Sequence, residues 1–181
     1  LINLVEDPSS VIPPDARMVL SVITDNLQML QAKIAVLDRE IAARAKANPT
    51  VKRLMTIPGV GPIAATALVA LAPAASSFRR GRDFAAWLGL TPRQHSSGGK
   101  EKLGRTTKMG ERSLRRLLII GASAAANAAA RHPARANDWL AGMLARKPRM
   151  LVTVALANKT ARIVWALMAH GGSYRTPAAA V

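Results

Sequence analysis

The chain has 181 residues, a formal net charge of +16 at pH 7 and no cysteine. Hydrophobic residues make up 50% of it, which is ordinary for a folded domain and excludes a disordered basic tail. The lack of cysteine excludes disulfides, thiolate zinc sites, iron–sulfur clusters and cysteine nucleophiles. A compact chain with this charge attracts polyanions, and we expect a nucleic acid as the partner. The alternative is a solvated basic surface without a specific partner.

The chain opens with Leu1 and shows no signal peptide, so we expect residues 1–14 to be a linker or remnant of a longer protein. Two uncharged runs could suggest membrane spans. The run 57–78 is interrupted by proline and glycine, and the run 117–130 is too short, since a span needs about 20 apolar residues. We therefore expect no membrane partner and a location in the bacterial cytoplasm, associated with the nucleoid.

Residues 15–48 are predicted to form one long helix, which begins after Pro13-Pro14 and ends at Asn48-Pro49. Apolar residues recur in it at alternating steps of three and four, the pattern of a coiled-coil seam. The seam residues are Leu20, Ile23, Leu27, Leu30, Ile34, Leu37 and Ile41. So narrow a seam favours pairing with another helix, and we expect a homo-oligomer. The alternative is a hairpin with a helix outside this sequence.

A compact helical domain is predicted over residues 49–172, followed by a tail over 173–181. Near its start, Gly59 and Gly61 stand before Pro62, an arrangement typical of a helix-hairpin-helix turn. The spacing also resembles a dinucleotide-binding turn, but no strand pattern precedes it. Free N–H groups at the second helix could hold a phosphate; the alternative is a packing turn without a ligand.

Further helices are predicted over residues 83–88, over 111–130, after Pro133 and over 150–170, where Gly171-Gly172 ends the last one. The helix after Pro133 contains Trp139. No strand-rich segment is evident. The expected fold class is therefore all-α, a long coiled-coil helix followed by a compact helical domain with a helix-hairpin-helix-like turn.

Basic residues concentrate in residues 79–116, where eleven cations face three anions. Residues 89–110 are expected to form a loop, in which basic and hydroxyl side chains suit phosphate contacts. Aromatic residues are not interleaved there, so base stacking is not expected. The candidate nucleic-acid-binding residues are Gly59, Gly61, Arg79, Arg80, Arg82, Arg93, Lys100, Lys102, Arg105, Lys108, Arg112, Arg115 and Arg116.

The carboxylates do not assemble into a metal site, because six of the ten precede residue 41 and no metal-binding spacing appears. No metal ligand is therefore assigned. The three histidines are scattered and are interpreted as surface residues. One segment, residues 95–100, places serine hydroxyls among cations. A serine that attacks a phosphodiester needs such charge stabilisation, although serine–glycine loops are also common without any chemistry.

Several motifs stand in one order along residues 50–170: Leu54-Met55-Thr56-Ile57-Pro58-Gly59-Val60-Gly61-Pro62, Phe84-Ala85-Ala86-Trp87-Leu88-Gly89-Leu90-Thr91-Pro92-Arg93, Ser96-Ser97-Gly98-Gly99-Lys100, Gly104-Arg105, Lys108-Met109-Gly110 and Leu114-Arg115-Arg116-Leu117-Leu118. With these motifs the chain strongly resembles the C-terminal transposase domain of the Piv-type insertion-sequence transposases, the DEDD family of bridge-RNA-guided, serine-dependent recombinases. The long helix resembles the coiled coil that precedes this domain.

The resemblance implies DNA strand cleavage and exchange through a covalent phosphoserine, with DNA and a structured guide RNA as partners. It implies that Ser97 is the nucleophile, with Ser96 as the alternative. It also implies that Mg²⁺ binds to an N-terminal RuvC-like acidic domain, which this sequence lacks, so that this chain binds no cofactor and is inactive alone. A non-catalytic nucleic-acid-binding module or a transposase remnant is the alternative function.

Overall fold

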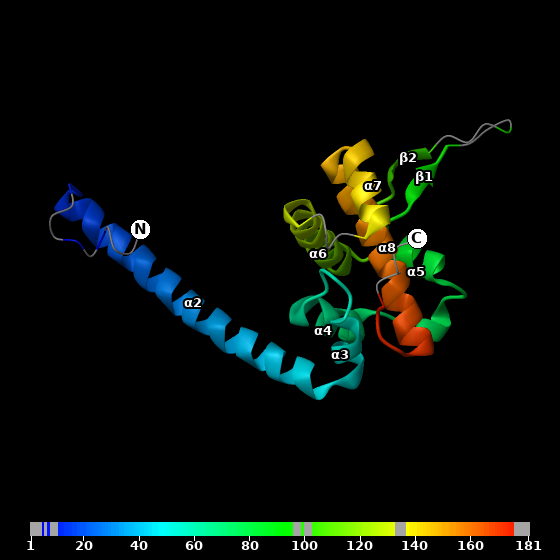
Figure 1. The fold of residues 1–181 in the computed structure, drawn as a ribbon. Helices are drawn as coiled ribbons and strands as arrows, with labels where there is room; N and C mark the ends of the chain where they lie inside the picture. Colours follow the sequence, from blue (N-terminus) through cyan, green and yellow to red (C-terminus); the bar gives the residue numbers. More distant parts are fainter. Residues whose placement is uncertain are drawn as a thin grey trace. The chain divides into compact units, whose positions relative to one another are not determined.

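The computed structural model describes residues 5, 7, 11–95, 99, 103–132 and 137–175. The chain divides into two compact units, Leu1–Ala43 and Arg44–Val181. Regular structure in the described residues is almost entirely helical, with one two-stranded sheet (Figure 1). The mostly helical fold expected from the sequence is therefore confirmed.

Helix α2, Pro14–Ala47, is a single helix of 34 residues. Asp15 lies in its first turn and Arg44 and Lys46 in its last, the charge distribution that a helix dipole favours. The chain then turns at Asn48, whose side-chain oxygen accepts hydrogen bonds from the N–H groups of Thr50 (2.9 Å) and Val51 (3.1 Å). This N-cap starts the next helix, so α2 ends where the Asn-Pro pair predicted.

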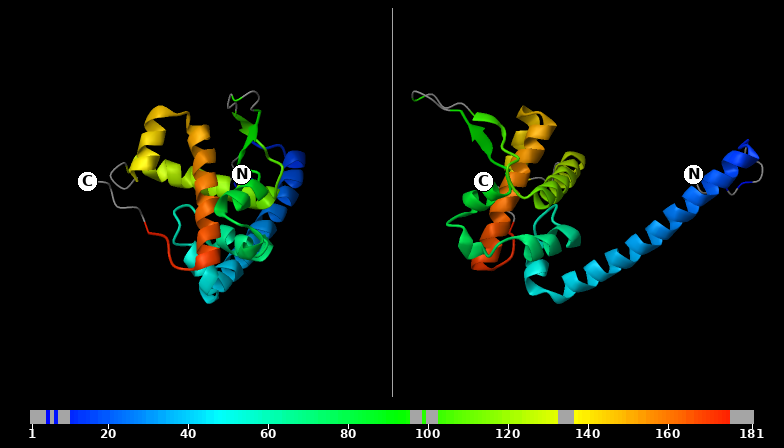
Figure 2. Two further views of the ribbon diagram at one scale, coloured as in Figure 1. Left: turned by 90° about the vertical axis from the view of Figure 1, so that its right-hand side faces the viewer. Right: turned by 180° about the vertical axis from the view of Figure 1, so that it is seen from behind.

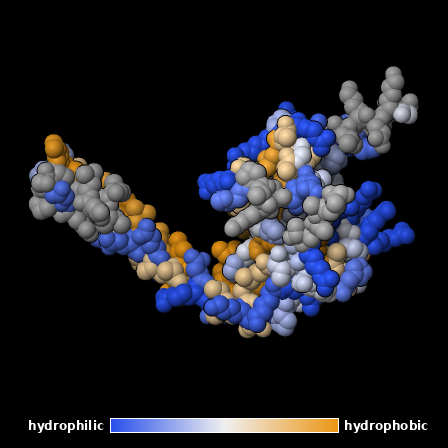
Figure 3. All heavy atoms as spheres, viewed as in Figure 1, coloured by the Kyte–Doolittle hydropathy of each residue, from blue (hydrophilic) through white to orange (hydrophobic). Residues whose placement is uncertain are grey.

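The predicted seam of α2 lies open to solvent along the middle of the helix. Leu27, Ile34 and Leu37 are 39%, 55% and 61% exposed. Apolar residues can be followed along α2 in Figure 3. Exposed apolar side chains in such a regular row are typical of a surface that binds a partner.

Helices α3, Pro49–Leu54, and α4, Pro62–Leu71, are joined by a tight turn, with Pro62 at the first helical position as predicted. Gly59 has φ +85°, a conformation that favours glycine. A side chain at Gly59 would clash with the backbone carbonyl of Gly121, and one at Gly121 with the carbonyl of Gly59. Gly61 has φ −89° and open space around it. The turn therefore needs glycine at 59 so that two backbones can touch.

Helix α5, Gly81–Trp87, leads into a β-hairpin made of β1, Pro92–Gln94, and β2, Leu103–Thr106. The strands are antiparallel, with Pro92 opposite Thr106, Gln94 opposite Leu103 and an irregularity between these pairs. The predicted loop over residues 89–110 thus contains a short sheet, a correction to the sequence analysis. The described strands project from the helices (Figures 1 and 2).

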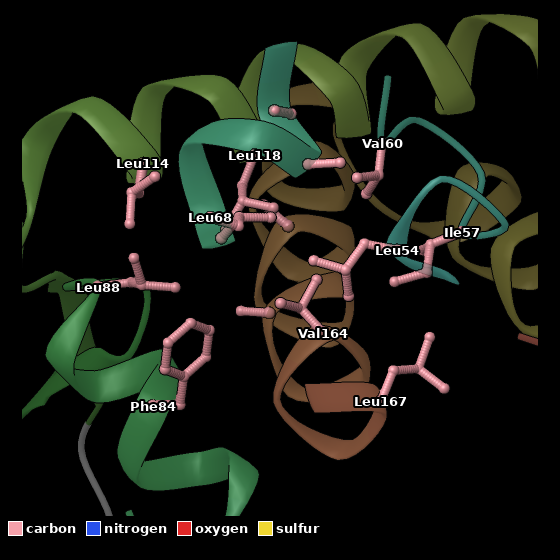
Figure 4. Packing of buried hydrophobic residues seen from close by; sticks show 14 of the residues in the cluster. Leu54, Ile57, Val60, Leu68, Phe84, Leu88, Leu114, Leu118, Val164 and Leu167 are labelled. Atoms are coloured by element: carbon pink, nitrogen blue, oxygen red, sulfur yellow. The ribbon is translucent and has the colours of Figure 1, made fainter. Parts of the chain in front are cut away.

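Helices α6, Arg112–Arg131, α7, Asp138–Arg146, and α8, Arg149–His170, complete the second unit. Helix α8 is its centre and packs against α3, α5, α6 and α7. Ala157, Ala161 and Val164 of α8 are fully buried, and Phe84 and Leu118 lie in the same core (Figure 4). The short 3-10 helix η1, Ala75–Ser77, is tied to α8 because the Trp165 Nε1 donates a hydrogen bond to the Ala75 carbonyl (3.1 Å).

The sequence analysis predicted a helix that starts at Pro133, but helix α7 begins at Asp138. Asn137 is its N-cap and accepts a hydrogen bond from the N–H of Leu140 (2.8 Å); Pro133 lies outside the described residues. Within the described part of the chain, α8 alone is long and apolar enough to cross a membrane by length and composition. Core helices of soluble proteins meet the same criterion, and α8 packs as a core helix here.

Candidate nucleic-acid interface

The base of the β-hairpin is held firmly between α5 and α6. The N–H of Thr107 donates to the Thr91 carbonyl (2.9 Å), and the N–H of Lys108 donates to the Gly89 carbonyl (3.2 Å). A side chain at Gly110 would clash with the Trp87 carbonyl, so these backbones are in contact. The hairpin therefore leaves the helical unit from a fixed base.

Arg115 reinforces this base from α6. Its Nη1 donates hydrogen bonds to the carbonyls of Leu88 (3.0 Å) and Gly110 (3.1 Å), and the side chain is half-buried. Arg115 was predicted to bind nucleic acid, and that role stays a prediction. The structure adds a positioning role that sequence reasoning missed, because the two carbonyls come from segments 22 residues apart.

Glu111 caps α6 just beyond the hairpin. Its carboxylate accepts a hydrogen bond from the N–H of Ser113 (2.9 Å). This hydrogen bond, above all other causes, lowers the pKa of Glu111 below its ordinary value of 4.5. The cap is exposed to solvent, and it fixes where the helix carrying Arg112, Arg115 and Arg116 begins.

Four of the candidate residues, Ser96, Ser97, Lys100 and Lys102, lie outside the described residues. They belong in sequence to the segment between β1 and β2. At the described edge of that segment, a side chain at Gly104 would clash with the His95 ring, so glycine lets the ring lie against β2. The Arg93 Nη2 donates to the Thr107 carbonyl at the long distance of 3.5 Å.

A groove of about 1330 Å³ runs between α5, the hairpin, α7 and α8. It brings together predicted residues that are distant in sequence, namely Arg80, Arg82, Arg105 and Lys108. Helix α8 adds two cations that the sequence analysis missed, Lys159 and Arg162. Their spacing of three residues on one helix places them on one face, the signal that could have identified them.

The other predicted residues do not line this groove. Arg79, Arg93, Arg112 and Arg116 are exposed at other positions of the second unit. Gly59 packs against α6, as expected if the turn serves helix packing. Gly61 lies at the start of α4.

An aromatic side chain from outside the basic segment lies in the groove, and the sequence analysis did not assign it to the site. Trp139 of α7 is 37% exposed and lines the groove. The Lys159 Nζ lies 4.1 Å from the centre of the Trp139 ring, a cation–π contact. Partial burial, followed by the charge of Arg162, lowers the pKa of Lys159.

No group of three His, Cys, Asp or Glu side chains that could hold a metal ion occurs in the described residues. The described donor set thus does not fit a Mg²⁺ site, which needs oxygen ligands that converge. What the described site offers is cationic charge, backbone turns and one exposed aromatic ring. These groups suit binding and positioning of a polyanion.

Part of this chain is similar to known transposases. Residues 51–137 match the model of the transposase IS116/IS110/IS902 family. The chain is 46% identical to a Pseudomonas aeruginosa protein named "Probable family 20 transposase", over 91% of this chain and 48% of that protein. It is 38% identical to the "Transposase for insertion sequence element IS1111A" of Coxiella burnetii, over 90% of this chain and 44% of that protein.

The "Transposase for insertion sequence element IS1328" of Yersinia enterocolitica is 35% identical over 88% of this chain and 48% of its own length. This chain therefore spans about half the length of the curated relatives that it matches. Residues 51–137, which hold the glycine turn, the hairpin and all of α6, are similar to the transposase IS116/IS110/IS902 family.

Proposed function

We propose that this chain is the C-terminal part of an insertion-sequence transposase, that it binds DNA, and that it supplies Ser97 as the nucleophile for strand cleavage and exchange. The observation that carries the proposal is the cationic groove at the base of the β1–β2 hairpin, whose lining residues from Arg80 to Lys108 lie in the segment similar to known transposases. Ser97 belongs in sequence to the connection between the two strands whose ends are fixed at that base.

In the proposed reaction, the Ser97 hydroxyl loses its proton to a base as its oxygen attacks a DNA phosphorus. An Oγ–P bond forms, the P–O bond to one deoxyribose oxygen breaks, and the departing oxygen takes up a proton. A deoxyribose hydroxyl of a second strand then loses its proton to a base and attacks the same phosphorus. A new P–O bond forms, the Oγ–P bond breaks, and the serine oxygen takes up a proton. Cations near the phosphate, such as Arg93 and Arg105, stabilise the negative charge that develops.

We assign no metal step to this chain, because its described residues offer no converging oxygen ligands. The proposal places Mg²⁺ on a RuvC-like acidic domain outside this sequence, and it follows that this chain alone does not cleave DNA. A guide RNA is proposed as the second nucleic-acid partner, since base pairing can supply sequence specificity while protein cations hold backbones. Pairing of α2 helices is proposed to join two copies.

The decisive experiment uses a full-length transposase that contains this chain and a plasmid recombination assay. Ser97→Ala should abolish recombination, while DNA binding stays within about twofold because a neutral hydroxyl adds little to phosphate affinity. Ser96→Ala is the matched control and should retain recombination. On a nicked substrate, the parent and Ser96→Ala should form a covalent protein–DNA complex that can be trapped. Ser97→Ala should form none. Full recombination by Ser97→Ala would refute the nucleophile assignment.

A second candidate function, a non-catalytic nucleic-acid-binding module, is favoured by the same groove, which needs no chemistry to hold a backbone. It predicts a steep salt dependence. The logarithm of the binding constant should fall linearly with the logarithm of salt concentration, with a slope of roughly −0.9 for each phosphate contacted on duplex DNA. It also predicts no effect of either serine substitution on any activity of the full-length protein.

A further inference from the structure

The groove has a cationic surface and an apolar surface side by side. The backbone of a DNA duplex would contact only the cationic one. The cationic surface includes Arg105, Lys159 and Arg162. The apolar surface includes Leu151 and Val154 of α8, on the same helix as two of those cations. Phosphates match the first surface, whereas only exposed bases match the second.

Trp139 has the position that a stacking platform requires. It lies at the first turn of α7, whose start is fixed by the Asn137 cap, and it is 37% exposed in the groove although Lys159 lies over its ring. A rigid helix thus presents an indole surface beside a cation. An aromatic ring next to a backbone-holding cation is the recurring arrangement in proteins that bind single strands.

The charge of the groove also selects a polyanion. The described residues that line it include six cations and no Asp or Glu. Arg80 keeps part of its charge balanced by Asp83, whose Oδ1 lies 3.7 Å from its Nε. The cations of α8 face the groove without a carboxylate among its described lining residues.

We propose that this groove binds single-stranded DNA, with a base stacked on Trp139 and the neighbouring phosphates held by Lys159, Arg162 and Arg105. The proposal rests on the proposed function, because it takes DNA as the substrate, and it adds that the strand is unpaired where it crosses α7 and α8. Strand exchange requires such unpaired segments. The groove borders β1 and β2, so a strand bound there would pass beside the hairpin.

Equilibrium binding of the 181-residue chain to a fluorescein-labelled 15-mer of deoxythymidine tests the proposal. Trp139→Ala should weaken binding about tenfold, the loss that stacking of one base corresponds to. Affinity for a labelled 15-base-pair duplex should change less than twofold. Trp139→Phe should recover part of the affinity, since a smaller ring still stacks. The tryptophan fluorescence of the parent should be quenched by the oligonucleotide, and that quenching should fall in both variants.

Lys159→Met should weaken binding of the single strand and lower the salt dependence by about 0.7, the single-strand value per phosphate contact. Lys52→Met is the matched control, because Lys52 is exposed on α3 and does not line the groove. It removes the same charge and should leave single-strand affinity within about twofold. Far-ultraviolet circular dichroism checks that Trp139→Ala folds. If Trp139→Ala does not fold, the affinity of Trp139→Phe for the single strand tests the proposal instead.

Three results would overturn the inference while leaving the proposed function standing. The first is an equal loss of affinity for single strand and duplex in Trp139→Ala. The second is unchanged single-strand affinity in both Trp139 variants. The third is a uridine 15-mer that binds more tightly than the DNA and depends on Trp139 in the same way. The last would make RNA the occupant. Failure of the parent chain to bind any DNA would instead overturn the proposed function and this inference together.

Discussion

Two long helices in this molecule were predicted from the sequence, yet they use their apolar side chains in opposite ways. Helix α2 leaves Ile34 55% exposed and Leu37 61% exposed, whereas α8 buries Ala157, Ala161 and Val164 completely. The seam of α2 has two positions per seven residues, while buried residues of α8 recur on a broader face. A narrow strip of large side chains suits one partner helix, and a broad face of small ones admits several close neighbours. The width of the apolar face therefore distinguishes the two uses better than the presence of periodicity.

The largest expected effect concerns the buried core around α8. Phe84→Ala removes a ring that is 1% exposed, contacts Phe78 edge to face and stacks on Trp87. We expect the free energy of unfolding to fall by about 3–5 kcal/mol, because a cavity replaces the ring. Urea denaturation followed by circular dichroism measures it. A loss below about 1 kcal/mol would mean that the core is not packed as described.

A smaller effect is expected where two backbones touch. Gly59→Ala should destabilise the chain by about 1–3 kcal/mol, since the new methyl meets the Gly121 carbonyl and φ is +85°. Gly61→Ala is the control, with φ −89° and no atom within 4 Å of the added carbon. It should change stability by less than about 0.5 kcal/mol. Equal effects of the two substitutions, measured by thermal denaturation, would contradict the packing described for this turn.

Substitutions on α2 should separate assembly from stability. Leu27→Lys combined with Ile34→Lys places two charges in the exposed seam. We expect the chain to become monomeric in sedimentation equilibrium, while the unfolding of Arg44–Val181 shifts by less than about 0.5 kcal/mol. Ala32→Lys lies off the seam and should leave the assembly intact. Unchanged oligomers in the double variant would exclude the seam as the contact.

The smallest effect concerns pH. A hydrogen bond from the Ser113 N–H lowers the pKa of Glu111 in the folded state, so its contribution is complete above the ordinary value of 4.5 and is lost as the pH falls through the lowered value. Glu111→Gln should therefore melt below the parent near pH 6, and this difference should shrink as the pH is lowered below 4.5. A difference in melting temperature that is constant from pH 3 to pH 7 would contradict a role for the ionised cap.

Local signals predicted much of this fold because they act within a few residues. Pro14, Asn48 and Pro62 mark helix ends in the sequence, and α2, α3 and α4 begin or end there. The hairpin was missed, because strands of three and four residues that contain Pro92 and Gly104 lack the alternation of a longer strand. Its pairing joins residues about a dozen positions apart.

The groove was only half predictable for a similar reason. Arg80, Arg82, Arg105 and Lys108 stand in a visibly basic segment, so charge alone identified them. Lys159 and Trp139 are twenty residues apart on different helices, and only the packing of α7 against α8 brings them together. The proposed nucleophile, Ser97, lies outside the described residues and is still a prediction.

Helix α8 supplies both the centre of the core and one wall of the groove, and this dual use restricts how the domain can diverge. Each residue of an α-helix is turned by about 100° from the one before. A single-residue insertion near Asn158 would therefore rotate Arg162 towards the core and fully buried Ala161 away from it. Relatives should vary here by substitution rather than by insertion or deletion. The same fixed register would let an engineer exchange groove side chains of α8 without redesigning the core.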